Sequence, residues 1–74
     1  MNIQDFIQKF AEAIDIENVE SLVSETTFHN LEEWSSLSVM LLIAFFDEEF
    51  DKQIGDKEIR DAITIKDLYN IATA

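Results

Sequence analysis

The stretch EEWSSLSVMLLIAFFDEEF, residues 32–50, combines three serines next to a tryptophan with an apolar run that ends in acidic residues. Serine is a favoured N-cap residue, and no helix-breaking residue follows until Gly55. The sequence therefore predicts a long helix that begins at Ser35 or Ser36 and ends at about Phe50. The chain has one glycine and no proline, so we expect the rest of the fold to be helical as well.

The N-terminal segment carries the apolar stripe of an amphipathic helix. Its apolar side chains recur at steps of three and four residues, as on one buried face: Ile3, Phe6, Ile7, Phe10, Ala11 and Ile14. From residue 15 to residue 34 this periodicity weakens and polar residues dominate. We expect a long loop there, with one helical turn near residues 19–23.

Two shorter helices are predicted after Gly55. Asp56 is a candidate N-cap for a short helix, and Thr64 followed three residues later by Asp67 is typical of a capping box that starts the last helix. The predicted fold class is all-α: a small four-helix bundle with a long first loop and a short third helix. We expect residues 1–74 to form a single domain, because 74 residues are too few for two.

Charge and cysteine content limit the classes of partner. The formal net charge is −11, from 16 acidic and five basic residues, which opposes binding to nucleic acids and to anionic membranes. Such a domain is suited to partners with basic patches, although solubility alone would also account for the acidity. The chain has no cysteine, no signal-peptide pattern and no apolar run long enough to span a bilayer. We expect a cytoplasmic protein, and a monomer.

The serines of the long helix lack the partners that nucleophilic catalysis requires. A catalytic serine needs a base within hydrogen-bond reach and donors for an oxyanion, and WSSLS lacks the glycine-flanked elbow of serine hydrolases. The only histidine, His29, is expected to be solvated in the polar loop, and one imidazole cannot form a metal site. We therefore expect no enzymatic activity and no bound metal. A hydroxyl in the first turn of a helix is instead suited to hold a phosphate, because nearby backbone N–H groups are unpaired.

Two segments of the chain resemble a known family. Trp34, Ser36 and Leu37, followed by a helix that closes in DEEF, resemble the W-D-S-L motif and the Glu-Glu-Phe helix end of acyl carrier proteins. The segment ITIKDLYNIA, residues 63–72, is similar to the start of the last helix in that family. The resemblance covers residues 31–72, and the family's four-helix bundle agrees with the predicted order of helices.

The resemblance implies that Ser36 carries a 4′-phosphopantetheine arm, which comes from coenzyme A and is linked as a phosphodiester, with Ser35 and Leu37 beside it. Acyl intermediates would be held as thioesters on the thiol of this arm and presented to partner enzymes. The chain has no cysteine, so any thioester must use an imported sulfur. The implied partners are a phosphopantetheinyl transferase and acyl-loading and acyl-transferring enzymes of fatty-acid biosynthesis or of a more specialised pathway, with basic or apolar docking patches.

The main departure from the family is Ser35, which stands where the family has an aspartate. Serine also caps helices, so the helix start is expected to survive. The missing carboxylate is one that helps the metal-dependent transferase to engage its substrate, so Ser35 bears on the efficiency of loading. Ser36 is the predicted attachment point because only this choice keeps Leu37 and Phe50 in the family register, and Ser38 is expected to face outward.

Two further sets of residues are candidate interaction sites. An apolar strip bracketed by acid on the outward side of the long helix is a candidate docking surface for a dedicated partner enzyme: Glu32, Glu33, Leu41, Ala44, Phe45, Asp47 and Glu48. Leu41 or Phe45 could instead pack under the long loop. A second set could line a cavity for an acyl chain or serve as ordinary core: Met40, Ile43, Phe46, Ile54, Ile59 and Leu68.

Three other functions are compatible with parts of the sequence. A carrier of aminoacyl or peptidyl groups is the nearest, but those domains are usually less acidic and carry Gly-Gly-x-Ser at the attachment site. An adaptor bundle that has lost the prosthetic group is the second, because Ser35 replaces the aspartate. Acidic residues at positions 1, 3 and 5 of a loop starting at Asp47 resemble a calcium-binding EF-hand, but Lys52 stands where the sharp turn requires glycine.

Overall fold

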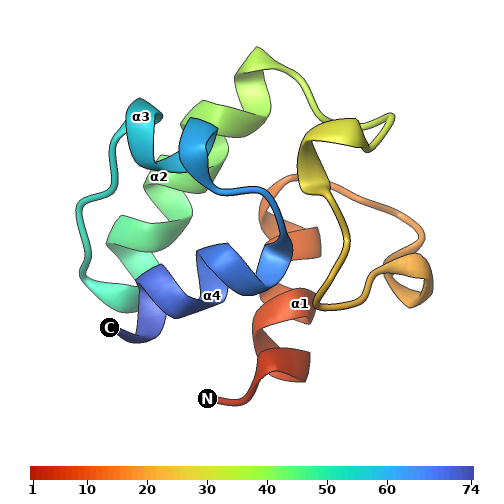
Figure 1. Ribbon diagram of the computed structural model, residues 1–74, viewed down its shortest axis with the longest axis horizontal. Coiled ribbons are helices and arrows are strands. Elements are labelled where there is room, and N and C mark those ends of the chain that lie inside the picture. The colour runs from red at the N-terminus through yellow and green to blue at the C-terminus, as the bar shows by residue number, and fades with distance from the viewer.

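The computed structural model describes residues 1–74 as four α-helices without β-strands. They are α1 (Ile3–Ala13), α2 (Ser36–Phe50), α3 (Asp56–Asp61) and α4 (Ile65–Thr73). The long connection between α1 and α2 contains two 3-10 turns, η1 (Val19–Ser21) and η2 (Phe28–Asn30). The predicted all-α class, the long first loop and the short third helix are confirmed. In Figure 1, α2 crosses the molecule diagonally, α1 and α4 pack beside it, and the long loop runs along the right of the view. No helix combines the length and the apolar character needed to cross a membrane.

α1 and α4 begin at side-chain caps. The Asn2 side chain accepts a hydrogen bond from the Asp5 N–H at 2.9 Å. At α4 the predicted capping box forms: Thr64 Oγ1 accepts from the Asp67 N–H at 3.2 Å, and the Asp67 carboxylate accepts from the Thr64 N–H at 3.0 Å and the Ile63 N–H at 2.9 Å. The two backbone bonds to the carboxylate stabilise its charged form, so they lower the pKa of Asp67 from its ordinary value of 3.8. The bond from the Thr64 N–H has the larger effect and that from the Ile63 N–H the smaller.

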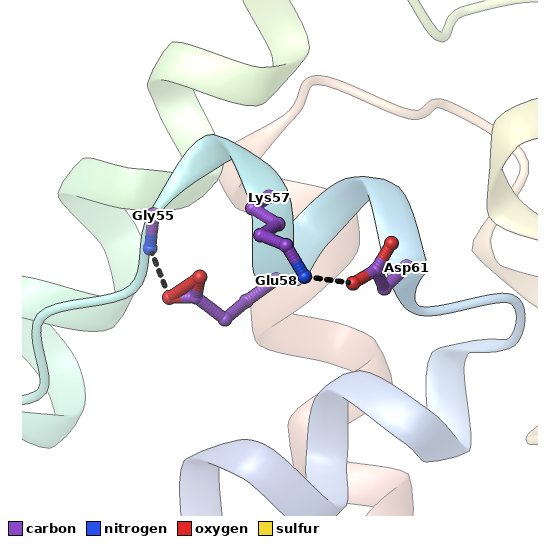
Figure 2. A network of polar contacts seen from close by, with 4 residues as sticks. All are labelled: Gly55, Lys57, Glu58 and Asp61. Atoms are coloured by element: carbon purple, nitrogen blue, oxygen red, sulfur yellow. Dashed lines mark hydrogen bonds and ion pairs between the residues drawn. The ribbon is translucent and has the colours of Figure 1, made fainter.

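The cap of α3 lies one residue earlier than predicted, at Gly55 instead of Asp56. The reason is Glu58, whose carboxylate reaches back and accepts a hydrogen bond from the Gly55 N–H at 2.9 Å (Figure 2). On the exposed side Lys57 and Asp61 form an ion pair at 3.1 Å, which Figure 2 also shows. This helix of six residues is thus stabilised in part by its own side chains.

Phe6 lies at the centre of the core that joins α1, α2 and α4. Its side chain is fully buried, and its ring centroid lies within 6.4 Å of those of five other aromatic rings: Phe10, Phe45, Phe46, Phe50 and Tyr69. Aromatic pairs at such separations add to the stabilisation that burial alone provides. Because α2 contributes three of these rings, the core fixes which face of α2 points inward.

The long loop is anchored by polar groups as well as by buried side chains. Phe28 is fully buried, and His29 Nε2 lies 3.1 Å from the carbonyl oxygen of Ile59 and 3.0 Å from that of Ala62. Both partners are acceptors, so Nε2 carries the hydrogen and shares it between them. The expectation that His29 is solvated is wrong, because its ring is half-buried and packs against the rings of Phe28 and Trp34. The loop is therefore tied to α3 just before the chain enters α2.

Candidate functional site

Ser36 is the first residue of α2, and it is exposed to solvent. Its hydroxyl makes no hydrogen bond within the protein, and the backbone N–H groups of Ser36 and Leu37 have no backbone acceptor. Unpaired N–H groups at the positive end of a helix dipole attract the oxygens of a phosphate. The start of α2 thus presents a free hydroxyl oxygen next to two backbone donors.

Ser35 and Ser38 occupy the two positions of a capping box at the start of α2, with Ser35 as the N-cap in an extended conformation. The Ser35 hydroxyl makes no cap hydrogen bond of standard geometry. Ser38 Oγ accepts a hydrogen bond from the Ser35 N–H at 3.0 Å and donates one to the Glu33 carbonyl oxygen at 3.3 Å. The expectation that Ser38 faces outward is wrong, because its side chain is 3% exposed and satisfies these two backbone groups.

Trp34 holds the turn that precedes Ser36. Its indole ring packs edge-on against the rings of Phe28 and His29, with centroid separations of 5.0 Å and 5.2 Å. Because His29 is itself hydrogen-bonded to the end of α3, Trp34 connects the start of α2 to that helix. The tryptophan of the motif therefore positions the serine through packing.

One stripe of α2 exposes four apolar residues on successive helical turns: Leu37, Met40, Leu41 and Ala44. The two leucines and the methionine are between 37% and 68% exposed. Exposed acidic residues border the stripe before the helix and in its last turns: Glu32, Glu33, Asp47 and Glu48. Leu41 and Ala44 belong to the predicted docking surface, and the exposed side chains of Leu37 and Met40 extend the same stripe. Single exposed apolar residues are common, but a contiguous stripe of them is typical of an interaction surface.

Phe45 is not part of this stripe. Its side chain is 6% exposed, and its ring packs against those of Phe6 at 5.9 Å and Phe50 at 5.4 Å. The prediction that Phe45 faces outward is wrong. Its aromatic partners come from α1 and from α2 itself, so it belongs to the core.

The six residues predicted to line an acyl pocket lie in two places. Phe46, Ile59 and Leu68 are at most 1% exposed and lie within the packed core. The other three share a surface groove of about 390 Å³ with residues of α2 and of the segment after it: Met40, Ile43 and Ile54. The structure therefore does not gather all six around one space.

A second groove, of about 370 Å³, runs beside Ser36 between the end of α1 and the start of α2. Leu37, Leu41 and Ile14 provide its apolar walls, and Asp15 contributes a carboxylate from the turn that follows α1. Nothing in the sequence pattern brings residues 14–15 to the serine motif, because they lie in the part of the chain where periodicity ends.

The acidic residues around the end of α2 do not form a calcium-binding loop. Asp47 and Glu49 belong to α2, which continues to Phe50. Asp51 is the C-cap, with a left-handed φ of 52°, and the Lys52 N–H then donates to the carbonyl oxygen of residue 46 at 3.2 Å. No group of three or more histidine, aspartate or glutamate side chains is arranged to hold a metal ion.

Comparisons with protein-family models and with curated proteins find no match to this chain.

Proposed function

We propose that this chain is an acyl carrier whose Ser36 bears a 4′-phosphopantetheine arm. The observation that supports the proposal most directly is the exposed, unbonded hydroxyl of Ser36 at the first position of α2, beside the unpaired N–H groups of Ser36 and Leu37. The resemblance of WSSL and DEEF to the family motif supports it as well. The chain itself is proposed to have no catalytic activity and to act in the cytoplasm.

Each residue at the start of α2 has a distinct part in this proposal. Ser36 Oγ is the attachment atom, and the N–H groups of Ser36 and Leu37 would be donors to the phosphodiester. Ser38 holds the first turn through its bonds to Ser35 and Glu33, so it positions the attachment residue without contacting the arm. The arm, when attached, supplies the thiol on which acyl groups are held as thioesters.

The carried acyl chain is proposed to lie on the surface of the bundle. A chain placed between Phe46, Ile59 and Leu68 would have to displace side chains that are already packed. A chain that lies along Met40 and Ile43 enters a groove that exists without rearrangement. Loading with octanoyl and butanoyl forms of the arm, followed by amide chemical shifts, checks this: the octanoyl form should add shifts at this groove and leave the amides of the buried three unchanged.

The function is tested by loading the protein in vitro. Purified protein is incubated with coenzyme A, magnesium and a broad-specificity phosphopantetheinyl transferase, and its intact mass is recorded. Wild type and Ser35→Ala should gain one phosphopantetheine increment, whereas Ser36→Ala should gain none. If Ser35→Ala alone lost the increment, the attachment residue would be Ser35 and the assignment to Ser36 would be wrong.

The second candidate function is an adaptor that carries no prosthetic group. The observation that favours it is Ser35 in the place of the family's aspartate, which removes a carboxylate used by the transferase. Failure of wild-type protein to gain mass, while Ser35→Asp gains it, would support the adaptor. A wild type that is loaded slowly and a Ser35→Asp variant that is loaded faster would support the carrier and explain the departure. An aminoacyl cargo on the same arm would be distinguished by the mass of the loaded form isolated from cells.

A further inference from the structure

A third groove, also of about 370 Å³, lies between α1 and α2 further from Ser36, and no residue of the attachment motif lines it. We call it the α1–α2 groove. Phe45 forms part of its floor, and the ring is held against Phe6 in the core, so the floor is anchored. Ala13 and Ala44 face the groove from the two helices, and their small side chains leave the depression open. Leu41 adds an exposed apolar wall.

The rim of this groove is acidic and almost without cations. Its charged residues are Lys9, Glu12, Glu48 and Glu49. Lys9 lies 3.5 Å from Glu49, which leaves Glu12 and Glu48 exposed and without an ion pair. Leu41 also lines the groove beside Ser36, so the two grooves adjoin. The groove beside Ser36 carries two more carboxylates, those of Asp15 and Glu33.

The negative charge of the whole chain is concentrated in the part that forms the groove. Twelve of the 16 acidic residues but only one of the five basic residues lie in residues 1–51, which contain α1, the long loop and α2. The remaining four basic residues lie in residues 52–74, together with the other four acidic residues. The net charge of −11 therefore belongs to the part of the chain that forms the groove.

We infer that the α1–α2 groove binds a basic amphipathic helix of a partner enzyme. Apolar side chains of such a helix would cover Leu41, Ala44 and the edge of Phe45, while lysines or arginines beside them would face Glu12 and Glu48. A second copy of this chain, a nucleic acid or an anionic membrane would each bring negative charge to an acidic rim. The groove shares Leu41 with the depression that Ser35 and Leu37 line on either side of Ser36, so a partner seated in it lies close to the attachment point. The inference rests on the proposed function only in taking the partner to be an enzyme that acts on the group carried by Ser36.

The groove can be tested without the arm and without a natural partner. The probe is a synthetic helical peptide with leucines on one face and lysines on the other, titrated into ¹⁵N-labelled protein that carries Ser36→Ala. Amide shifts should concentrate on α1 and α2 at the groove, and affinity should fall as salt is raised. A peptide of the same composition, shuffled so that neither face is apolar, should bind at least about tenfold more weakly.

Two pairs of variants locate the binding. Glu12→Lys with Glu48→Lys should weaken peptide binding about tenfold or more, whereas Glu17→Lys with Glu20→Lys, an equal change of charge on the exposed loop, should change it less than about threefold. Ala44→Trp, which fills the groove, should abolish binding, whereas Asn70→Trp on the exposed side of α4 should not.

Equal effects of the two charge pairs, or amide shifts centred on α3 and α4, would overturn the inference. These outcomes are independent of the loading test, because the peptide experiment uses protein that cannot carry the arm. If the protein binds the peptide in the groove but is never loaded, the inference about the groove stands and the proposed carrier function fails. If it is loaded but does not bind the peptide there, the carrier function stands and the inference about the groove fails.

Discussion

Substitution of Ser38 by alanine tests the structure at the start of α2 most directly. The change removes the acceptor of the Ser35 N–H at 3.0 Å and the donor to the Glu33 carbonyl at 3.3 Å. Loss of a helix cap costs about 1 kcal/mol, and the longer second bond adds roughly 0.5 kcal/mol. The better helix propensity of alanine offsets about 0.5 kcal/mol. The expected net loss in the free energy of unfolding is therefore about 1 kcal/mol, which corresponds to a fall in Tm of about 4–8 °C for a domain of this size.

Ser36→Ala is the matched control, because it removes the same hydroxyl two residues earlier, where the side chain is exposed and makes no hydrogen bond. It should change the free energy of unfolding by less than about 0.5 kcal/mol. Urea unfolding followed by Trp34 fluorescence and by far-UV circular dichroism measures both variants under the same conditions. If Ser36→Ala destabilises the protein as much as Ser38→Ala does, the role assigned to the Ser38 hydroxyl in the capping box is refuted.

Three further predictions concern the core, the loop anchor and the last cap. Phe46→Ala should lower the free energy of unfolding by about 3–5 kcal/mol, because it empties a fully buried site. Met40→Ala on the exposed stripe should lower it by less than about 0.5 kcal/mol. Similar losses for the two variants in urea unfolding would contradict the assignment of the buried and exposed faces of α2. His29→Ala should cost about 1–2 kcal/mol in the same assay, since two carbonyls at the end of α3 lose their shared donor, and an unchanged midpoint would show that the loop is held without it. For Asp67 the folded-state pKa is the lower one, so wild type should exceed Asp67→Asn in stability above the ordinary value of 3.8 and lose this advantage as the pH falls through the folded-state value. Unfolding curves of both proteins from neutral pH to below pH 3.8 measure the difference, and a difference that stays constant would contradict it.

The helix boundaries were predictable because their signals are local. The stripe at residues 3–14, the serines before α2 and the Thr64–Asp67 box each specify an element within a few residues. The one displaced cap, at Gly55, also has a local cause, since the carboxylate three residues later replaces the side chain that a cap normally supplies. Local chemistry thus accounts for the order and ends of the helices.

The faces of α2 were not predictable in the same way. α2 is apolar on nearly all sides between residues 37 and 46, so periodicity does not decide between Leu41 and Phe45 as the buried residue. The choice is made by Phe6 of α1, which packs against the phenylalanines of α2 and leaves Leu37 and Leu41 on the outward side. His29 is a similar case, because its partners lie 30 and 33 residues further along the chain. Side chains whose neighbours are distant in sequence carry no local signal of their position.

The exposed stripe of α2 has a cost that the fold does not explain. A domain of 74 residues has little apolar surface to bury, yet it leaves Leu37 and Met40 largely, and Leu41 partly, in water. The same half of the molecule concentrates the negative charge, which opposes compact folding through self-repulsion. Both costs would be offset when a basic, apolar partner covers the surface, because binding removes the exposed side chains from water and supplies the missing cations. Surface features that weaken the free domain and favour a complex are better explained by selection for a partner than by selection for stability.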